Sequence, residues 1–369
     1  MTDASPLLDV RRLSVDYLSA SGTVHAVSDV SFTLARGEVL GLAGESGCGK
    51  STLAYAAAQL LEPPAVITAG AVRYHRPPRA GARTTEPATP IELTRLREPE
   101  LRALRWNDLA IVFQSAMNAL NPVMTVGAQI DDTLRAHRRG MGAAARAARA
   151  RELLALVGIA ADRLGSYPHE LSGGMRQRAT IAIALALEPE LIIMDEPTTA
   201  LDVVVQRDIL TELLRLRERL RFSIIFITHD LSLLLEIADR IAIMYAGRIV
   251  EQTSARELRR QPRHPYSYGM LHAFPTLTGP RRAMLGIPGS PPDLRRPPTG
   301  CGFAARCPLV FAPCASVLPP LLPLASAAEQ LVACHRYDPR HSSRELPTDA
   351  ELAAAYAALG DATAGETPA

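Results

Sequence analysis

The sequence lacks a charge imbalance, a long apolar run and a basic leader, and each absence excludes a class of protein. Its 40 lysines and arginines against 38 aspartates and glutamates leave a formal charge of +2, which gives no electrostatic case for nucleic acid as a partner. The longest apolar runs, such as residues 222–228, fall far short of the roughly 18 to 20 residues that span a bilayer. The acidic start has no basic segment before an apolar core, so we expect a cytosolic chain whose membrane role, if any, comes through a partner.

The chain has enough length and apolar content for a globular protein of two or three domains. It has 369 residues, of which 47% are hydrophobic, and no solenoid-type repeat is visible. Its five cysteines are an odd number. In a reducing compartment, clustered thiols more often indicate metal binding or catalysis than disulfides.

Hydrophobic patterning predicts an α/β core that contains an inserted helical subdomain. Residues 7–43 predict strands that end at a glycine-rich turn, and residues 50–61 predict a helix. The loop composition of residues 76–90 predicts an exposed insertion. Helical patterns fill residues 115–185, most clearly at 142–159, and apolar strand patterns then return at 191–194, 222–228 and 241–245.

The later part of the chain has a different composition. Between Pro262 and Pro323 lie 14 of the 29 prolines, which exclude long helices and central strands there. We therefore expect an irregular appended domain, followed by a tail that frays beyond one helix at 349–359. The predicted boundaries are 1–261 for a nucleotide-binding domain with its helical subdomain at about 115–185, 262–336 for a proline-rich domain with the cysteines, and 337–369 for the tail.

A phosphate-binding loop follows the first group of predicted strands. Residues 44–51 read GESGCGKS, which matches G-x-x-x-x-G-K-[ST] between a predicted strand and a predicted helix. Lys50 is expected to reach the β- and γ-phosphates and Ser51 to hold Mg²⁺, with the helix amino terminus favouring the anion. Cys48 is expected to be a small packing residue. The predicted nucleotide-binding residues of this segment are Gly44, Glu45, Ser46, Gly47, Cys48, Gly49, Lys50, Ser51 and Thr52.

Two carboxylates end a buried strand at residues 191–197, LIIMDEP. An acidic pair at the carboxyl end of a strand beside a phosphate loop suits Mg²⁺ and an attacking water. We predict that Asp195 lies on the metal side and that Glu196 polarises the water as general base.

A second anion-binding turn begins at Ser172 and continues through Gly173 and Gly174 within ELSGGMRQR. Because the chain already has one phosphate loop, this turn is best explained as serving the nucleotide of another subunit. Five motifs in order then carry a resemblance to the ATP-binding cassette (ABC) ATPases. They are GESGCGKS at 44–51, LSGG at 171–174, IIMDEP at 192–197, TALD at 199–202 and ITHD at 227–230.

The resemblance to ABC ATPases implies further roles. Gln114 matches the glutamine that contacts Mg²⁺ and relays to the membrane subunit, and His229 matches the residue at the γ-phosphate. Asp202 is implied to lie across the dimer seam, and Tyr17 to stack on adenine. From the residues alone, His229 reads equally well as a core histidine. For Tyr17, an ordinary strand tyrosine is the lesser alternative.

Several stretches resemble one branch of that family, the dipeptide/oligopeptide importer ATPases. They are residues 113–130, Met175, and residues 263–275, 287–294 and 300–308. This resemblance implies an ATP- and Mg²⁺-dependent motor subunit at the cytoplasmic face of the membrane. Its implied partners are a second, related cassette subunit, two transmembrane permeases and, through them, an extracytoplasmic solute-binding protein, with no nucleic acid. Import of nickel, glutathione or another small solute is the alternative, and a soluble ABC ATPase of DNA repair or translation is a more distant one.

Four of the cysteines, Cys301, Cys307, Cys314 and Cys334, have the spacing C-x₅-C-x₆-C-x₁₉-C. This spacing lacks the C-x₂₋₄-C pairs typical of zinc sites, and Pro308 follows Cys307 as in some iron–sulfur motifs, yet it leaves iron–sulfur, zinc, and disulfides or free thiols all open. The resemblance to the importer branch implies a [4Fe–4S] cluster. We expect a structural role, with redox sensing as the second option, and expect His335 to be a neighbour rather than a ligand.

Overall fold

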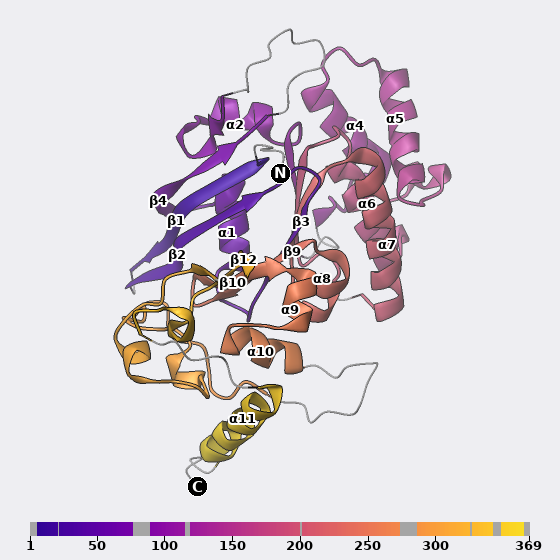
Figure 1. The fold of residues 1–369 in the computed structure, drawn as a ribbon. Helices are drawn as coiled ribbons and strands as arrows, with labels where there is room; N and C mark the ends of the chain where they lie inside the picture. Colours follow the sequence, from indigo (N-terminus) through magenta and orange to yellow (C-terminus); the bar gives the residue numbers. More distant parts are fainter. Residues whose placement is uncertain are drawn as a thin grey trace.

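Two β-sheets organise the protein (Figure 1). The computed structural model describes residues 6–20, 22–76, 89–114, 119–199, 201–273, 286–324, 327–341 and 348–364. The predicted insertion at 76–90 therefore lies almost wholly outside the described residues. No helix in the described ranges is long and apolar enough to cross a membrane.

The central sheet has eight strands in the order β11-β12-β10-β9-β3-β8-β7-β6. The five strands from β9 to β6 are parallel, and β10, β12 and β11 continue the sheet antiparallel. The carboxyl ends of the parallel strands thus meet at one edge, where ligands bind in sheets of this kind. The strands predicted at 191–194, 222–228 and 241–245 are confirmed. The bounds are β3 Val39–Ala43, β6 Leu109–Val112, β7 Leu191–Asp195, β8 Ser223–Ile227, β9 Arg240–Tyr245, β10 Arg248–Ser254, β11 Leu322–Leu324 and β12 Ala327–Val332.

The position of β7 inside the central sheet explains why residues 191–194 are all apolar rather than alternately apolar and polar. Ile192 and Met194 belong to the hydrophobic core that includes α6 and α7, whereas Leu191 and Ile193 belong to the core that includes α1. Both faces of the parallel sheet are therefore covered, and each residue of the strand is buried.

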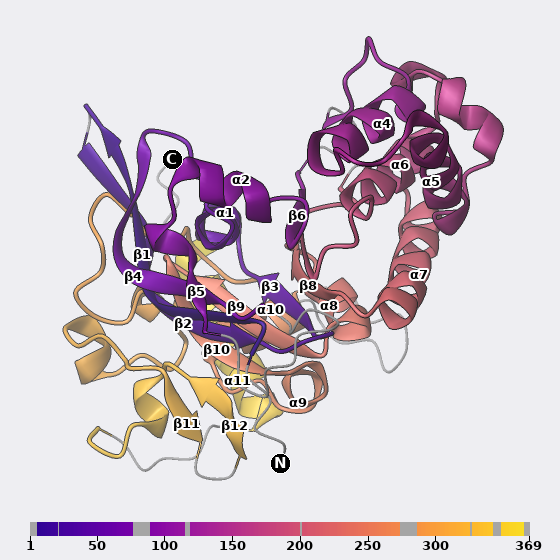
Figure 2. The same ribbon diagram turned by 90° about the horizontal axis from the view of Figure 1, so that it is seen from above.

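A helical group projects from the β6 side of the central sheet (Figure 2). It confirms the helical subdomain expected from the pattern, including the helix at 142–159. Thr125 caps the first of these helices through a hydrogen bond from the amide of Ala128 to its Oγ1 at 3.2 Å. The bounds are α4 Val126–His137, α5 Ala143–Leu156, η2 Ala161–Gly165, η3 Pro168–Glu170 and α6 Gly173–Ala184, and α7 follows β7 at Val203–Leu220.

The four-stranded sheet is antiparallel, in the order β2-β1-β4-β5, and α1 packs between it and the central sheet. Leu53 and Ala54 of α1 share one hydrophobic core with strands of both sheets. The bounds are β1 Leu8–Ser19, β2 Gly22–Leu34, α1 Lys50–Ala57, β4 Ala65–Tyr74, β5 Ile91–Glu92, η1 Leu93–Arg95 and α2 Glu98–Leu104.

Helix α1 ends four residues before the predicted Leu61. Gln59 adopts a left-handed conformation with φ of 55°, and the amide of Leu60 donates to the carbonyl of Tyr55 at 2.8 Å. This is the hydrogen bond of a Schellman motif, formed here without the usual glycine. Composition alone gave no signal for the stop.

The proline-rich region is irregular, as expected, and it is joined to the core. Strand β12 pairs with β10, so the region extends the central sheet. The helix predicted at 349–359 begins at the expected residue but continues to Ala364; its Tyr356 is buried and donates to the carbonyl of Pro265 at 2.6 Å. The remaining bounds are α8 Leu231–Ile237, α9 Ala255–Arg260, α10 Pro265–His272, η4 Ala304–Arg306, η5 Ala312–Ala315, η6 His335–Tyr337 and α11 Asp349–Ala364.

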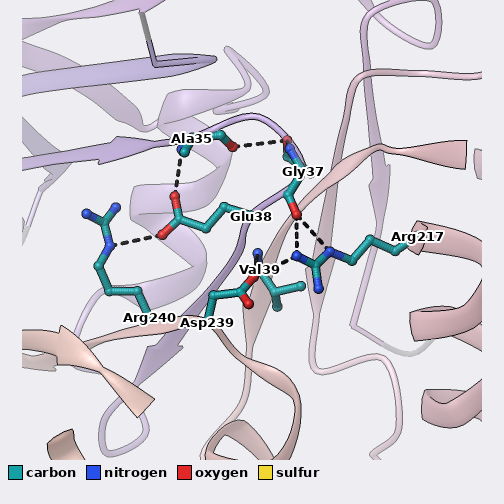
Figure 3. Close-up of polar contacts among 8 residues, drawn as sticks. Ala35, Gly37, Glu38, Val39, Arg217, Asp239 and Arg240 are labelled. Carbon is teal, nitrogen blue, oxygen red and sulfur yellow. Dashed lines mark hydrogen bonds and ion pairs between the residues drawn. The ribbon is translucent and has the colours of Figure 1, made fainter. Parts of the chain in front are cut away.

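A polar network fixes the amino-terminal end of β3 (Figure 3). The carboxylate of Glu38, whose pKa is raised by burial, pairs with Arg240 at 3.0 Å. The carboxylate of Asp239 accepts from the amide of Val39 and from Arg217, both at 2.8 Å. These contacts join the start of β3 to α7 and β9, and so hold the strand that delivers the phosphate loop at its other end.

Candidate phosphate-binding and hydrolytic site

The phosphate loop connects β3 to α1 and requires glycine at two of its positions. Gly44 and Gly49 have φ of 151° and 102°, and a Cβ on either would lie 2.3 Å from a backbone oxygen, that of Met244 or Ala26 respectively. No side chain caps α1. The first amides of the helix are therefore free to bind an anion, which the helix dipole also favours.

Lys50 is buried beneath this loop. Its Nζ donates to the carbonyls of Gly44 at 2.8 Å and Glu45 at 2.9 Å. Cys48 packs in the core beside it, and burial raises the pKa of its thiol, so it is a neutral packing residue. The loop carbonyls therefore hold the Lys50 ammonium in place. This positive charge suits the binding of a negatively charged phosphate.

Ser51 and Asp195 meet at the carboxyl end of β7. The hydroxyl of Ser51 donates to Asp195 at 3.0 Å, and the hydroxyl of Tyr55 donates to its other oxygen at 2.8 Å. Burial raises the pKa of Asp195, and the two hydrogen bonds oppose that shift. A carboxylate beside a hydroxyl is an oxygen donor set that suits Mg²⁺.

Glu196 lies at the centre of a second polar group. Its carboxylate accepts from Nε2 of Gln114 at 3.1 Å and from the hydroxyl of Thr199 at 3.0 Å, and it lies 3.3 Å from Nδ1 of His229. The backbone of Glu196 is left-handed, with φ of 44°, a strained conformation for a residue other than glycine. Three predicted catalytic residues from three separate segments are thus in contact.

The residues expected to serve another subunit have local roles as well. Ser172 caps α6 by accepting from the amide of Met175 at 3.3 Å, and Asp202 caps α7 by accepting from the amide of Val205 at 2.9 Å. A Cβ on Gly174 would lie 2.6 Å from the Val205 side chain, so this glycine is needed where α6 approaches α7. The two helices present their amino termini beside each other.

Tyr17, the predicted adenine contact, lies on β1 next to the phosphate loop. Its hydroxyl is 3.1 Å from Oγ1 of Thr52 on α1. Tyr17 is partly exposed.

Cys301, Cys307, Cys314 and Cys334 line one small cavity, together with Phe303, Phe311 and His335 among others. All four are free cysteines in the structure. Burial raises the pKa of Cys301 to about 11 and that of Cys334 to about 12.

A different group, His335, Asp338 and His341, is the one set of three or more His, Cys, Asp or Glu side chains among the described residues that lie close enough to share a single ion. The Asp338 carboxylate already accepts from Arg340 at 2.6 Å, so a cation would have to displace a guanidinium. The four cysteines do not form such a single-ion group.

Sequence reasoning missed four residues that hold the site. Tyr55 is one helical turn after Ser51, and Thr199 is three residues after Glu196, so their spacing on a helix or turn could have identified both. Tyr266 and Arg306 contact Glu45 from more than 200 residues away, and no local pattern indicates them.

Two family models match the chain. Residues 27–199 match the ABC transporter model, and residues 250–314 match the C-terminal region of oligopeptide/dipeptide transporters. Between them, the matches cover the phosphate loop, the acidic pair and the first three cysteines of the cavity.

Relatives and solved structures agree with these matches. A dipeptide transport ATP-binding protein of Bacillus subtilis is 42% identical over 316 residues, which are 85% of this chain and 90% of that protein. A putative peptide import ATP-binding protein of Brucella abortus is 44% identical over 317 residues, or 85% and 91%. An oligopeptide transport ATP-binding protein of Bacillus subtilis is 42% identical over 83% of this chain and 82% of its own. A dimeric ATP-binding cassette solved in a post-hydrolysis state with ADP and phosphate is 26% identical, with a TM-score of 0.57 over 68% of this chain and 99% of its own.

Proposed function

The chain belongs to the ATP-binding subunits of oligopeptide and dipeptide ABC transporters, and we propose that it powers the import of di- and oligopeptides. It is an ABC-type ATPase, the motor subunit of its transporter. The observation that carries the hydrolytic role is the contact of Glu196 with Gln114 and His229, next to the Ser51 and Asp195 pair.

In the proposed mechanism Lys50 and backbone amides of the phosphate loop bind the phosphates of ATP, and Tyr17 stacks on adenine. Ser51, Asp195 and Gln114 would hold Mg²⁺, which would neutralise phosphate charge. Glu196 removes a proton from the attacking water, and His229, at 3.3 Å from Glu196, contacts the γ-phosphate side.

A second cassette completes the site in this proposal. Ser172, Gly173, Gly174 and Asp202 contact the ATP held by the other subunit. Support comes from the adjacent amino termini of α6 and α7 and from Val203 and Val204, whose exposed fractions are 71% and 70%. We propose a related, non-identical partner for this dimer.

The cassette pair works with two transmembrane permeases at the cytoplasmic face of the inner membrane, where this subunit is peripheral. Peptide reaches the permeases from an extracytoplasmic solute-binding protein, so this chain does not contact cargo. Import of nickel, glutathione or another small solute is the second candidate. The proposed division of the chain is 1–261 for the ATPase, 262–336 for the cysteine-containing domain and 337–369 for the tail.

We propose that Cys301, Cys307, Cys314 and Cys334 hold a [4Fe–4S] cluster with a structural role, or less favourably a redox-sensing one. Two observations support the fit. The four thiols line one cavity, and their sulfurs are not spaced as ligands of a single ion, which disfavours zinc. Four metal–thiolate bonds would cross-link a proline-rich segment that has little regular structure of its own.

Replacement of Glu196 by Gln tests the hydrolytic role. The variant keeps the phosphate loop, so it should bind ATP normally, while steady turnover falls by roughly 10²- to 10⁴-fold because the general base is lost. ATP-bound dimers should accumulate on gel filtration. Glu190→Gln is the matched control, since Glu190 pairs with Arg36 at the opposite end of β7. Turnover of Glu196→Gln within threefold of wild type contradicts the assignment.

Cargo and cluster are tested separately. Cells that lack the gene should lose uptake of labelled dipeptides but keep uptake of nickel; the reverse result supports the second candidate. Anaerobically purified protein should contain about four irons per chain and lose them in Cys314→Ser but not in Cys48→Ser. Stoichiometric zinc without iron contradicts the cluster.

A further inference from the structure

The polar groups of one phosphate-loop residue, Glu45, are all held by other residues. Its amide donates to the hydroxyl of Tyr266 at 2.8 Å, and its carbonyl accepts from Lys50 at 2.9 Å. Its carboxylate accepts from Nη1 of Arg306 at 2.7 Å. The conformation of the loop at this residue is therefore set partly from outside the loop.

Arg306 belongs to η4, 261 residues after Glu45, in the loop between Cys301 and Cys307. Only 6% of its side chain is exposed, against 27% for Glu45. All three guanidinium nitrogens have further partners: Nη1 also reaches the hydroxyl of Tyr245 at 3.1 Å, Nε donates to the carbonyl of Pro288 at 2.7 Å, and Nη2 donates to that of Ile287 at 3.3 Å. The position of the guanidinium is thus fixed by two backbone carbonyls and the Tyr245 hydroxyl, independently of Glu45.

An aromatic cluster holds the same region together. The rings of Tyr245, Tyr266 and Phe303 lie 4.6 to 5.3 Å apart, and the Arg306 guanidinium lies 5.8 and 5.9 Å from the centres of the Tyr245 and Phe303 rings. A planar cation with several donors suits this position, whereas a lysine could satisfy only part of it.

The contact reaches the chemistry through Lys50. The carbonyls of Gly44 and Glu45 orient the Lys50 ammonium, and the peptide unit of the Glu45 carbonyl also carries the amide of Ser46, the next residue of the phosphate loop. A displacement of Glu45 therefore changes both the cation and the amides at the phosphate site. Loss of Arg306 or of Glu45 also leaves the other, largely buried charge unpaired. An unpaired buried charge favours movement of its side chain, and hence displacement of the loop at residue 45.

We propose that Arg306 is a positioning residue of the ATP site, which holds the phosphate loop in its binding conformation through Glu45. It touches neither ATP nor the reacting water. The role goes beyond the ATPase function stated above and does not depend on what the four cysteines bind.

The test uses the full-length subunit with Arg306→Gln, Glu45→Gln and the double variant. Each single variant should weaken ATP binding about tenfold, the loss expected for one hydrogen bond between charged groups. In the assembled transporter, the turnover number of Arg306→Gln at saturating ATP should stay within about twofold of wild type, because Glu196 and its partners are untouched. The double variant should bind ATP about as weakly as either single variant, since both remove the same contact.

Arg295→Gln is the matched control. Arg295 lies in the same proline-rich region and pairs with Asp293 at 2.8 Å, but this pair is solvent-exposed, so ATP binding should not change. Glu45→Gln distinguishes loss of the Glu45–Arg306 contact from misfolding of the proline-rich region, because it leaves the other contacts of Arg306 in place. Trp106 fluorescence and circular dichroism check the fold of every variant.

Three results overturn the proposal. One is a folded Arg306→Gln or Glu45→Gln protein that binds ATP as tightly as wild type. The second is a double variant whose affinity falls by the product of the single effects, roughly 100-fold. The third is a lower turnover number at unchanged ATP affinity, which is the result of a general structural defect.

Discussion

Removal of the Tyr55 hydroxyl should destabilise the protein more than removal of an ordinary buried hydroxyl. This hydroxyl donates to the buried Asp195 carboxylate at 2.8 Å, and the Tyr55 ring makes an edge contact with Phe113 at 5.8 Å that phenylalanine preserves. A hydrogen bond to a charged group contributes about 1.5–3 kcal/mol, compared with about 0.5–1.5 kcal/mol for a neutral pair. We therefore expect Tyr55→Phe to lower the free energy of unfolding by about 2 kcal/mol.

Tyr17→Phe is the matched control, because it deletes the same hydroxyl where the partner is the neutral Thr52 hydroxyl at 3.1 Å. Its cost should be about 1 kcal/mol or less. The assay is urea unfolding with EDTA present, followed by fluorescence of Trp106, the single tryptophan, which packs against the main core. In an Asp195→Asn background the cost of Tyr55→Phe should fall to the neutral range. Equal costs in both backgrounds, or for both tyrosines, would refute the reasoning.

Three further predictions concern the dimer, the membrane partner and pH. Ser172→Arg should leave ATP affinity of the isolated subunit unchanged and stop turnover in the assembled transporter, because Ser172 caps α6 and lies outside the phosphate loop; an equal loss of affinity in the monomer contradicts this. Ala119→Cys, at an exposed position near Val123, whose exposed fraction is 79%, should crosslink to a permease, and its failure beside a crosslinking control pair would exclude docking there. Burial raises the pKa of Glu251, so its contribution to stability is fully present below about pH 4.5 and is lost as pH rises through the raised pKa. Glu251→Gln should therefore gain stability relative to wild type as pH rises. A stability difference between the two proteins that is independent of pH would contradict this prediction.

The contacts of the candidate site were largely predictable because its signals are local. A phosphate loop has its glycines, Lys50 and Ser51 within eight residues, and the strand before it is apolar on both faces. Asp195 and Glu196 follow a strand of the same kind. Since parallel strands bring their carboxyl ends to one edge, the expectation that these segments meet needed only the order of strands and motifs.

Boundaries and supporting residues were less predictable, for two physical reasons. The end of α1 depends on the left-handed conformation of Gln59, which this residue type adopts only where tertiary contacts favour it. Ser172 and Asp202 cap helices in this chain, and they are also expected to contact the nucleotide of a partner. A sequence motif does not tell which of these two roles requires the residue.

The contact between Glu45 and Arg306 shows why the region after residue 261 cannot be treated as an appendage. Pairing of β12 with β10 continues the central sheet, and Tyr266 and Arg306 hold Glu45 from outside the phosphate loop. Each partner is unremarkable in its own segment: the tyrosine lies on a short helix, and the arginine lies between two cysteines. Their significance arises only when the sheet brings the segments together. A residue that completes a site across 261 positions is specified by the fold rather than by any spacing, so the proline-rich region is a structural part of the ATPase.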